Sequence, residues 1–235
     1  MTKPAQKRRE RFFVEQAIYS LGAGWTIREE RDPPDFIIAD GDHLFGLDVV
    51  DVFGGSRNEH GSLTKRAESD TQKHLNSLRH QYEAKTGVNL CVKFLGRIAS
   101  DGLANVVSEL VALDLASKPM TYQTVVEIQT GLDAPLKLYV TKTNRSEWFA
   151  MSDRVGFVTP NPDAILAEEI ARKSKKLAQY KSLVGEDVRL LLVADRIQNS
   201  GKIGDMTHGA FDFHGFRAVY FFPYPEKVLV LREAR

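Results

Sequence analysis

Two stretches of the sequence decide the fold, Pro33-Pro34-Asp35-Phe36-Ile37-Ile38-Ala39 and Leu44-Phe45-Gly46-Leu47-Asp48-Val49-Val50-Asp51-Val52-Phe53. Both are dense in β-branched and aromatic residues, which predicts two strands, and the Asp40-Gly41-Asp42 turn between them predicts a hairpin. The prolines cannot lie inside a sheet ladder, so the first strand begins after them. The hairpin therefore sets two strands side by side, and each strand offers one carboxylate, Asp35 or Asp48.

The flanking sequence predicts an α/β fold in which helices flank a mixed central sheet that carries extra strands. Apolar residues recur at helical spacing from about residue 8 to residue 21, where Gly22-Ala23-Gly24 ends the helix. The other predicted elements are strands at 25–29, 88–95, 121–128, 136–141, 155–158 and 188–193, helices at 63–86, 101–116 and 163–184, and a hairpin of 216–222 and 227–231. The run at 188–193 is unbroken and apolar, as expected of a strand covered on both faces.

The length of 235 residues suits one domain over 1–235, with a strand-rich segment at 119–160 that is either inserted or extends the main sheet. A single cysteine, Cys91, excludes a disulfide within the chain and a cysteine zinc site. No apolar stretch approaches the roughly 20 residues of a membrane helix, and the basic N-terminus lacks the apolar region of a signal peptide. We therefore expect a cytoplasmic protein that makes no membrane contact.

Basic residues gather in two places, although the net charge is only +1. The clusters are Lys3, Lys7, Arg8, Arg9 and Arg11, and Arg172, Lys173, Lys175, Lys176 and Lys181. Such patches on a neutral protein suit modest, salt-sensitive phosphate contacts, and the alternative is solvated helix faces. Lys173, Lys176 and Arg57, which follows the glycine-rich Gly54-Gly55-Ser56, are the candidate contacts with nucleic acid.

The two aspartates of the hairpin are the candidate metal ligands. Hard cations such as Mg²⁺ and Mn²⁺ prefer oxygen ligands, and Mg²⁺ is often held by one or two carboxylates with water and phosphate oxygens. Leu47, Val49 and Val50 predict that Asp48 is buried, where a carboxylate needs a partner or a metal. For Asp35 the alternative is a residue that caps the Pro-Pro turn.

A helix, a strand opening on Pro34-Asp35, a strand carrying Asp48, and then a helix and a strand resemble the core of the PD-(D/E)XK nuclease superfamily. The resemblance covers about 8–96, with a looser match over 169–194. It implies that Glu15 of the first helix, Asp35 and Asp48 hold Mg²⁺ or Mn²⁺ and that the protein hydrolyses phosphodiester bonds of DNA, with RNA left open. It also implies a setting in restriction, repair or defence, and a homodimer if both strands of a duplex are cut.

The sequence departs from the superfamily at position 50, where Val50 replaces the usual lysine. Strand alternation puts positions 48 and 50 on one face, and valine can neither orient a water nor stabilise developing charge. One explanation moves the lysine to another element, with Lys65, Lys73 or Lys93 as candidates. The other is a catalytically inactive nuclease-fold protein that binds nucleic acid or has a regulatory role. A structural subunit with 121–158 as its interface is a third interpretation.

Other chemistries have no support in the sequence. Walker, Gly-x-Gly-x-x-Gly and Gly-x-Ser-x-Gly motifs are absent, which argues against nucleotide triphosphate, dinucleotide and serine hydrolase sites. His43 precedes the second strand of the hairpin, where it could lie at the entrance of the site. His74 and His80 are six positions apart, which is not the spacing of a helical metal pair.

Overall fold

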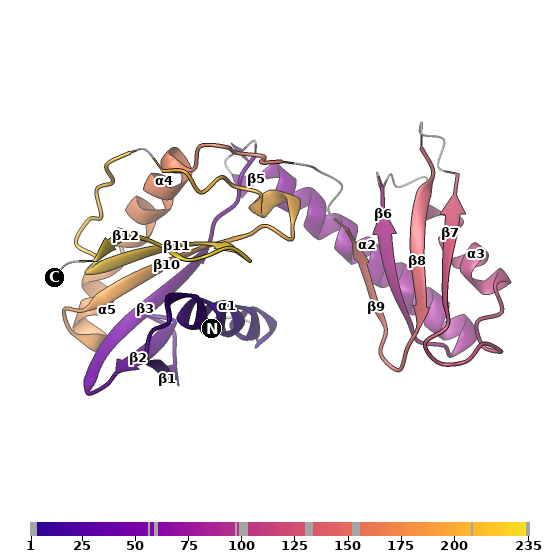
Figure 1. The fold of residues 1–235 in the computed structure, drawn as a ribbon, viewed down its shortest axis with the longest axis horizontal. Helices are drawn as coiled ribbons and strands as arrows, with labels where there is room; N and C mark the ends of the chain where they lie inside the picture. Colours follow the sequence, from indigo (N-terminus) through magenta and orange to yellow (C-terminus); the bar gives the residue numbers. More distant parts are fainter. Residues whose placement is uncertain are drawn as a thin grey trace. The chain divides into compact units, whose positions relative to one another are not determined.

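The computed structural model describes residues 4–55, 57–58, 61–96, 98, 103–129, 134–151, 156–207 and 209–233. The chain forms two compact units, one made of 1–62 and 156–235 and the other of 63–155 (Figure 1). Within the described ranges, no helix is long and apolar enough to cross a membrane.

The first unit is built on a six-stranded mixed sheet in the order β1-β2-β3-β10-β11-β12 (Figure 1). Its strands are β1 (Trp25–Glu30), β2 (Phe36–Asp40), β3 (His43–Asp51), β10 (Val188–Asp195), β11 (Ala218–Tyr224) and β12 (Leu229–Glu233). β3, β10 and β11 run parallel, whereas the outer pairs are antiparallel. The predicted α/β class is confirmed, and β10 is buried along nearly its whole length, as its apolar sequence predicts.

Helices cover both faces of this sheet. α1 (Pro4–Leu21) packs Phe13 and Ala17 into the core on one face, and α4 (Asp163–Ser174) and α5 (Leu177–Val184) pack Ile170 and Tyr180 into the core on the other. The sequence predicted one helix over 163–184, but a turn at 175–176 divides it. A short 3₁₀ helix, η2 (Asn199–Gly201), follows β10.

The β2–β3 hairpin has the register that places the two aspartates together. Phe36 pairs with Leu47, and both side chains enter the core under α1. Continued by one residue, this register sets Asp35 opposite Asp48. Because side chains alternate along a strand, both aspartates point to the face that α4 and α5 cover.

In the part that the structure describes, the second unit is a four-stranded sheet in the order β7-β8-β6-β9, together with two α-helices. Its elements are α2 (Leu63–Thr86), β6 (Leu90–Leu95), α3 (Val106–Ala112), β7 (Gln123–Ile128), β8 (Leu136–Lys142) and β9 (Glu147–Ala150). Tyr82, Phe94 and Trp148 lie in its core. Two short strands, β4 (Arg57–Asn58) and β5 (Gly61–Ser62), pair just before α2.

The second unit is longer than the segment predicted at 119–160. It begins at α2 because α2, β6 and α3 bury their apolar residues in the same core as the later strands. The strand predicted at 155–158 is replaced by the earlier β9, and residue 155 lies outside the described residues. Strand periodicity reports which side chains are buried, and it does not report which sheet a strand joins.

Gly46 tests the packing of α5 on β3. A Cβ at this position would lie 2.7 Å from Val184 Cγ2 and 3.0 Å from Pro34 Cγ. We expect Gly46→Ala to lower the free energy of unfolding by about 1 to 3 kcal/mol through overpacking, as measured by urea denaturation. Gly24→Ala, where a Cβ meets nothing within 4 Å, is the matched control. Equal stability of both variants and the wild type would contradict this packing.

Candidate active site

A cavity of about 570 Å³ lies over the second half of β3. Its walls come from α1, the residues before β2, β3, α4 and α5, all in the first unit. Its charged lining residues are Glu10, Asp32, Asp35, Asp48, Asp51, Arg172, Lys173 and Lys176. Val50, which stands where the resemblance leads us to expect a lysine, also lines this cavity. The cavity therefore exposes the face of β3 from which that lysine is missing.

The two aspartates are buried, and each has a lysine beside it. Asp48 is 3% exposed and Asp35 is 8% exposed. The Nζ atom of Lys173 lies 2.6 Å from Asp48 Oδ2 and 3.5 Å from the carbonyl oxygen of Val49. Lys7 Nζ lies 3.2 Å from Asp35 Oδ1, and the Val49 amide donates a 2.9 Å hydrogen bond to Asp35 Oδ2. The backbone of β3 therefore fixes the orientation of Asp35 directly.

Burial and mutual repulsion govern the protonation of this pair. Burial raises the pKa of Asp48 to about 6, the charge of Asp35 adds to the rise, and Lys173 opposes it. Burial, followed by the charge of Asp48, raises the pKa of the Tyr180 hydroxyl. Asp35, Asp48 and Tyr180 thus form one electrostatically coupled group, in which Lys173 supplies the compensating charge.

Glu10 of α1 lines the cavity, whereas the predicted Glu15 does not. Burial and then the charge of Asp35 raise the pKa of Glu10. The side chain of Glu15 is 51% exposed and accepts a 2.9 Å hydrogen bond from Arg11. Helix geometry accounts for the difference, because Glu10 precedes the buried Phe13 and Ala17 by three and seven positions and so shares their face. The same spacing in the sequence could have favoured Glu10.

The remaining predicted site residues are distributed as follows. Lys65 and Lys73 lie on α2 of the second unit, where Lys73 pairs with Asp70 at 2.8 Å. Lys93 lies on β6, which belongs to the sheet of that unit. Lys176 is exposed at the cavity, and the side chain of Arg57 lies outside the described residues. Lys173, expected only as a nucleic-acid contact, is the lysine that lies beside Asp48.

Asp35 and Asp48 are the two carboxylates of the cavity that could hold a divalent cation. In the part of the chain that the structure describes, no three His, Cys, Asp or Glu side chains are grouped closely enough to hold a metal ion. Asp48 Oδ2 and Glu10 Oε2 are buried there without a directed hydrogen bond, and each lies beside a lysine amine. Mg²⁺ is often held by only one or two carboxylates, with water and phosphate oxygens completing its shell. Asp35 and Asp48 meet that requirement.

Comparisons of the chain with family models, with curated proteins and with solved structures found no match. The geometry of the cavity is therefore the observation that bears on function.

The raised pKa of Asp48 predicts a specific dependence of stability on pH. Between about pH 4 and pH 6 the native protein holds this proton while the unfolded chain releases it, so the stability contributed by Asp48 falls as pH rises through this window. Relative to Asp48→Asn, we expect wild type to lose roughly 2 kcal/mol of unfolding free energy between pH 4 and pH 7. Urea denaturation of both proteins across this range measures the difference. A constant difference would show that Asp48 has an ordinary pKa.

Proposed function

We propose that this protein is a Mg²⁺- or Mn²⁺-dependent nuclease that hydrolyses phosphodiester bonds of nucleic acid, with DNA as the expected substrate. One observation carries the proposal: Asp35, just before β2, lies beside Asp48 of the neighbouring strand β3, and Lys173 Nζ is 2.6 Å from Asp48 in the cavity that Val50 lines. An ammonium group at this place supplies the function that a lysine at position 50 would have supplied.

The order of elements in the first unit supports a PD-(D/E)XK-like core. α1, the strands β1 to β3, the α4–α5 pair and β10 follow the order helix, three strands, helix, strand, with the second unit interposed between β3 and α4. The sequence had assigned the final strand of this core to 88–95, but β6 belongs to the other sheet. β10 instead lies parallel to β3 and pairs Leu190 with Asp48.

Different residues of the cavity have different roles in hydrolysis. A metal held by Asp35 and Asp48 would polarise the phosphoryl oxygen and acidify an attacking water. The Lys173 ammonium orients that water and stabilises the negative charge that develops on the phosphoryl oxygens. The water oxygen bonds to phosphorus as the ester P–O bond breaks, the water's proton passes to solvent, and the leaving oxygen takes a proton from solvent. Lys176 contacts a neighbouring phosphate of the strand.

A second candidate is a nuclease-fold protein without catalytic activity, which binds nucleic acid or has a regulatory role. Val50 is the observation that favours it, because the usual lysine is missing from β3. The two candidates differ in what Lys173 does: in the nuclease it acts on the water and the phosphate, and in the inactive protein it only neutralises the buried Asp48.

A nicking assay on plasmid DNA, with an RNA substrate in parallel, separates these candidates. We expect cleavage that requires Mg²⁺ or Mn²⁺, and we expect Lys173→Met to slow it by about a hundredfold or more while calorimetry still detects metal binding. Asp48→Asn abolishes both metal binding and cleavage. Lys227→Met removes a lysine that is exposed in the β11–β12 hairpin and leaves both unchanged. Wild type that binds metal but cleaves neither substrate would favour the inactive protein.

The two glutamates of α1 are expected to differ in their effect on the rate of cleavage. Because Glu10 lines the cavity beside Asp35 and Glu15 pairs with Arg11 at the surface, we expect Glu10→Gln to lower the cleavage rate about tenfold or more. Glu15→Gln is expected to retain the wild-type rate, and metal titrations of the rate in both variants show whether affinity changes. A slow Glu15→Gln variant together with a wild-type rate for Glu10→Gln would instead assign Glu15 to the site.

A further inference from the structure

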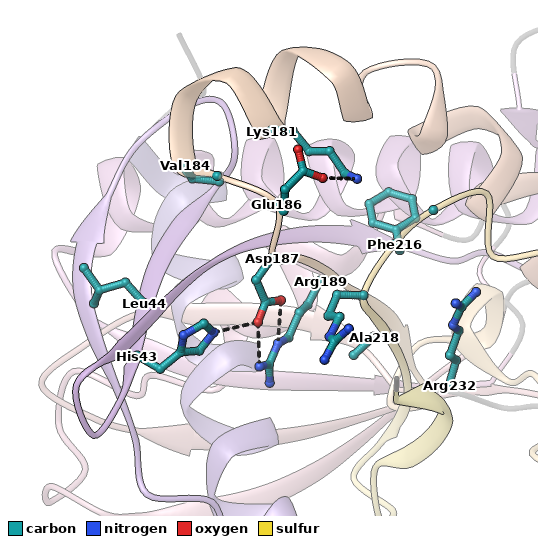
Figure 2. A pocket seen from close by; sticks show the side chains of 13 residues that line it. His43, Leu44, Lys181, Val184, Glu186, Asp187, Arg189, Phe216, Ala218 and Arg232 are labelled. Atoms are coloured by element: carbon teal, nitrogen blue, oxygen red, sulfur yellow. Dashed lines mark hydrogen bonds and ion pairs between the residues drawn. The ribbon is translucent and has the colours of Figure 1, made fainter. Parts of the chain in front are cut away.

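A second cavity, of about 890 Å³, lies where the parallel strands β3, β10 and β11 begin (Figure 2). It shares no lining residue with the acidic cavity, which lies over the second half of β3. Its charged and titratable lining residues are His43, Lys181, Glu186, Asp187, Arg189, Arg217 and Arg232. Four of these side chains are lysine or arginine and two are carboxylates, so the lining carries a surplus of positive charge.

Asp187, the half-buried carboxylate of this cavity, is already neutralised. Arg189 donates hydrogen bonds from Nε and Nη2 to Asp187 at 3.0 and 2.9 Å, and His43 Nε2 lies 2.8 Å from the same carboxylate (Figure 2). Burial alone would raise the pKa of Asp187, but the hydrogen bonds from Arg189 and His43 hold that pKa below its ordinary value. Arg189 is itself buried, with its guanidinium carbon 3.7 Å from the centre of the Phe45 ring. Asp187 therefore brings little repulsion to an entering anion.

Two exposed arginines of the lining, Arg217 and Arg232, are available to bind an anion. Glu186 pairs with Lys181 at 2.7 Å, but the Glu186 side chain is 85% exposed, and a pair that water reaches is weak. Arg217 and Arg232 are both exposed, and neither has a carboxylate partner among the residues that the structure describes. Arg232 lies at the far side of the cavity from His43 (Figure 2), with its guanidinium carbon 5.4 Å from the Phe213 ring.

We propose that this cavity binds a phosphate monoester, carried either by a free nucleotide or by the phosphorylated end of a nucleic acid strand. Arginine presents a planar fork that matches phosphate oxygens, and a phosphate monoester carries between one and two negative charges at neutral pH. Leu44 and Val184 provide an apolar wall against which a sugar or base packs. The volume lies in the range of small-molecule sites. The proposal does not depend on the nuclease activity, because the two cavities have separate linings.

The test is calorimetry at low ionic strength without divalent metal. The probes are inorganic phosphate, adenosine monophosphate, and a short single-stranded DNA with either a phosphate or a hydroxyl at its 5′ end. The double variant Arg217→Ala/Arg232→Ala is compared with Arg28→Ala/Arg145→Ala, which removes two exposed arginines from outside the cavity. Because all four side chains are exposed, circular dichroism is expected to show both variants folded like wild type.

We expect wild type to bind the phosphorylated probes, the cavity variant to bind them at least about tenfold more weakly, and the control variant to match wild type. Tighter binding of the mononucleotide than of the phosphorylated strand identifies a nucleotide site, and the opposite order identifies a strand end. Asp48→Asn is expected to bind the mononucleotide normally, so failure of the metal site would leave this result intact. Any one of three results would overturn the proposal. The first is no binding of any phosphorylated probe, and the second is an equal loss of affinity in both double variants. The third is equal affinity for the 5′-phosphate and 5′-hydroxyl strands together with no binding of the mononucleotide.

Discussion

The ion pair of Lys173 and Asp48 is the interaction on which the candidate active site depends. Asp48 stands in the middle of a buried strand, and an isolated carboxylate there would cost far more free energy than packing could return. Lys173 reaches it from the last turn of α4, so the pair ties that helix to β3 at one position and in one orientation. Removing Lys173 would leave the buried carboxyl group of Asp48 without its compensating charge, which is in general strongly destabilising. The pair therefore holds the last turn of α4 at the wall of the cavity.

The hairpin could be predicted from the sequence because everything that defines it is local. Alternation, the two prolines and the Asp40-Gly41-Asp42 turn fix the strands, and the turn fixes which residues face each other. The same reasoning failed for β6, which reads as a strand but belongs to the other sheet. Sheet membership is decided by contacts distant in sequence, here the packing of β6 with α2, α3 and β9, and no local pattern encodes them.

In the candidate site too, residues placed by local structure could be predicted from the sequence, whereas a residue placed by distant contacts could not. Asp35 and Asp48 follow from the hairpin register, and helix phase alone places Glu10, rather than Glu15, on the face of Phe13 and Ala17. Lys173 is different, because 124 positions separate it from Val49, whose carbonyl it approaches. In the sequence it is one member of a basic cluster on an amphipathic helix, and solvation is the ordinary explanation of such a lysine. Only the docking of α4 on the sheet distinguishes Lys173 from its exposed neighbours.

Although the net charge of the chain is only +1, the first unit has two local regions whose charged residues differ in character. Around Asp35 and Asp48, carboxylates are concentrated and lysines offset them, which suits a cation. At the start of β3, β10 and β11, the acids are paired internally and arginines are left over, which suits an anion. Because the two cavities share no lining residue, each one acts on a ligand through its own side chains. The pairing of charges within each cavity, which the net charge does not report, therefore distinguishes the two cavities.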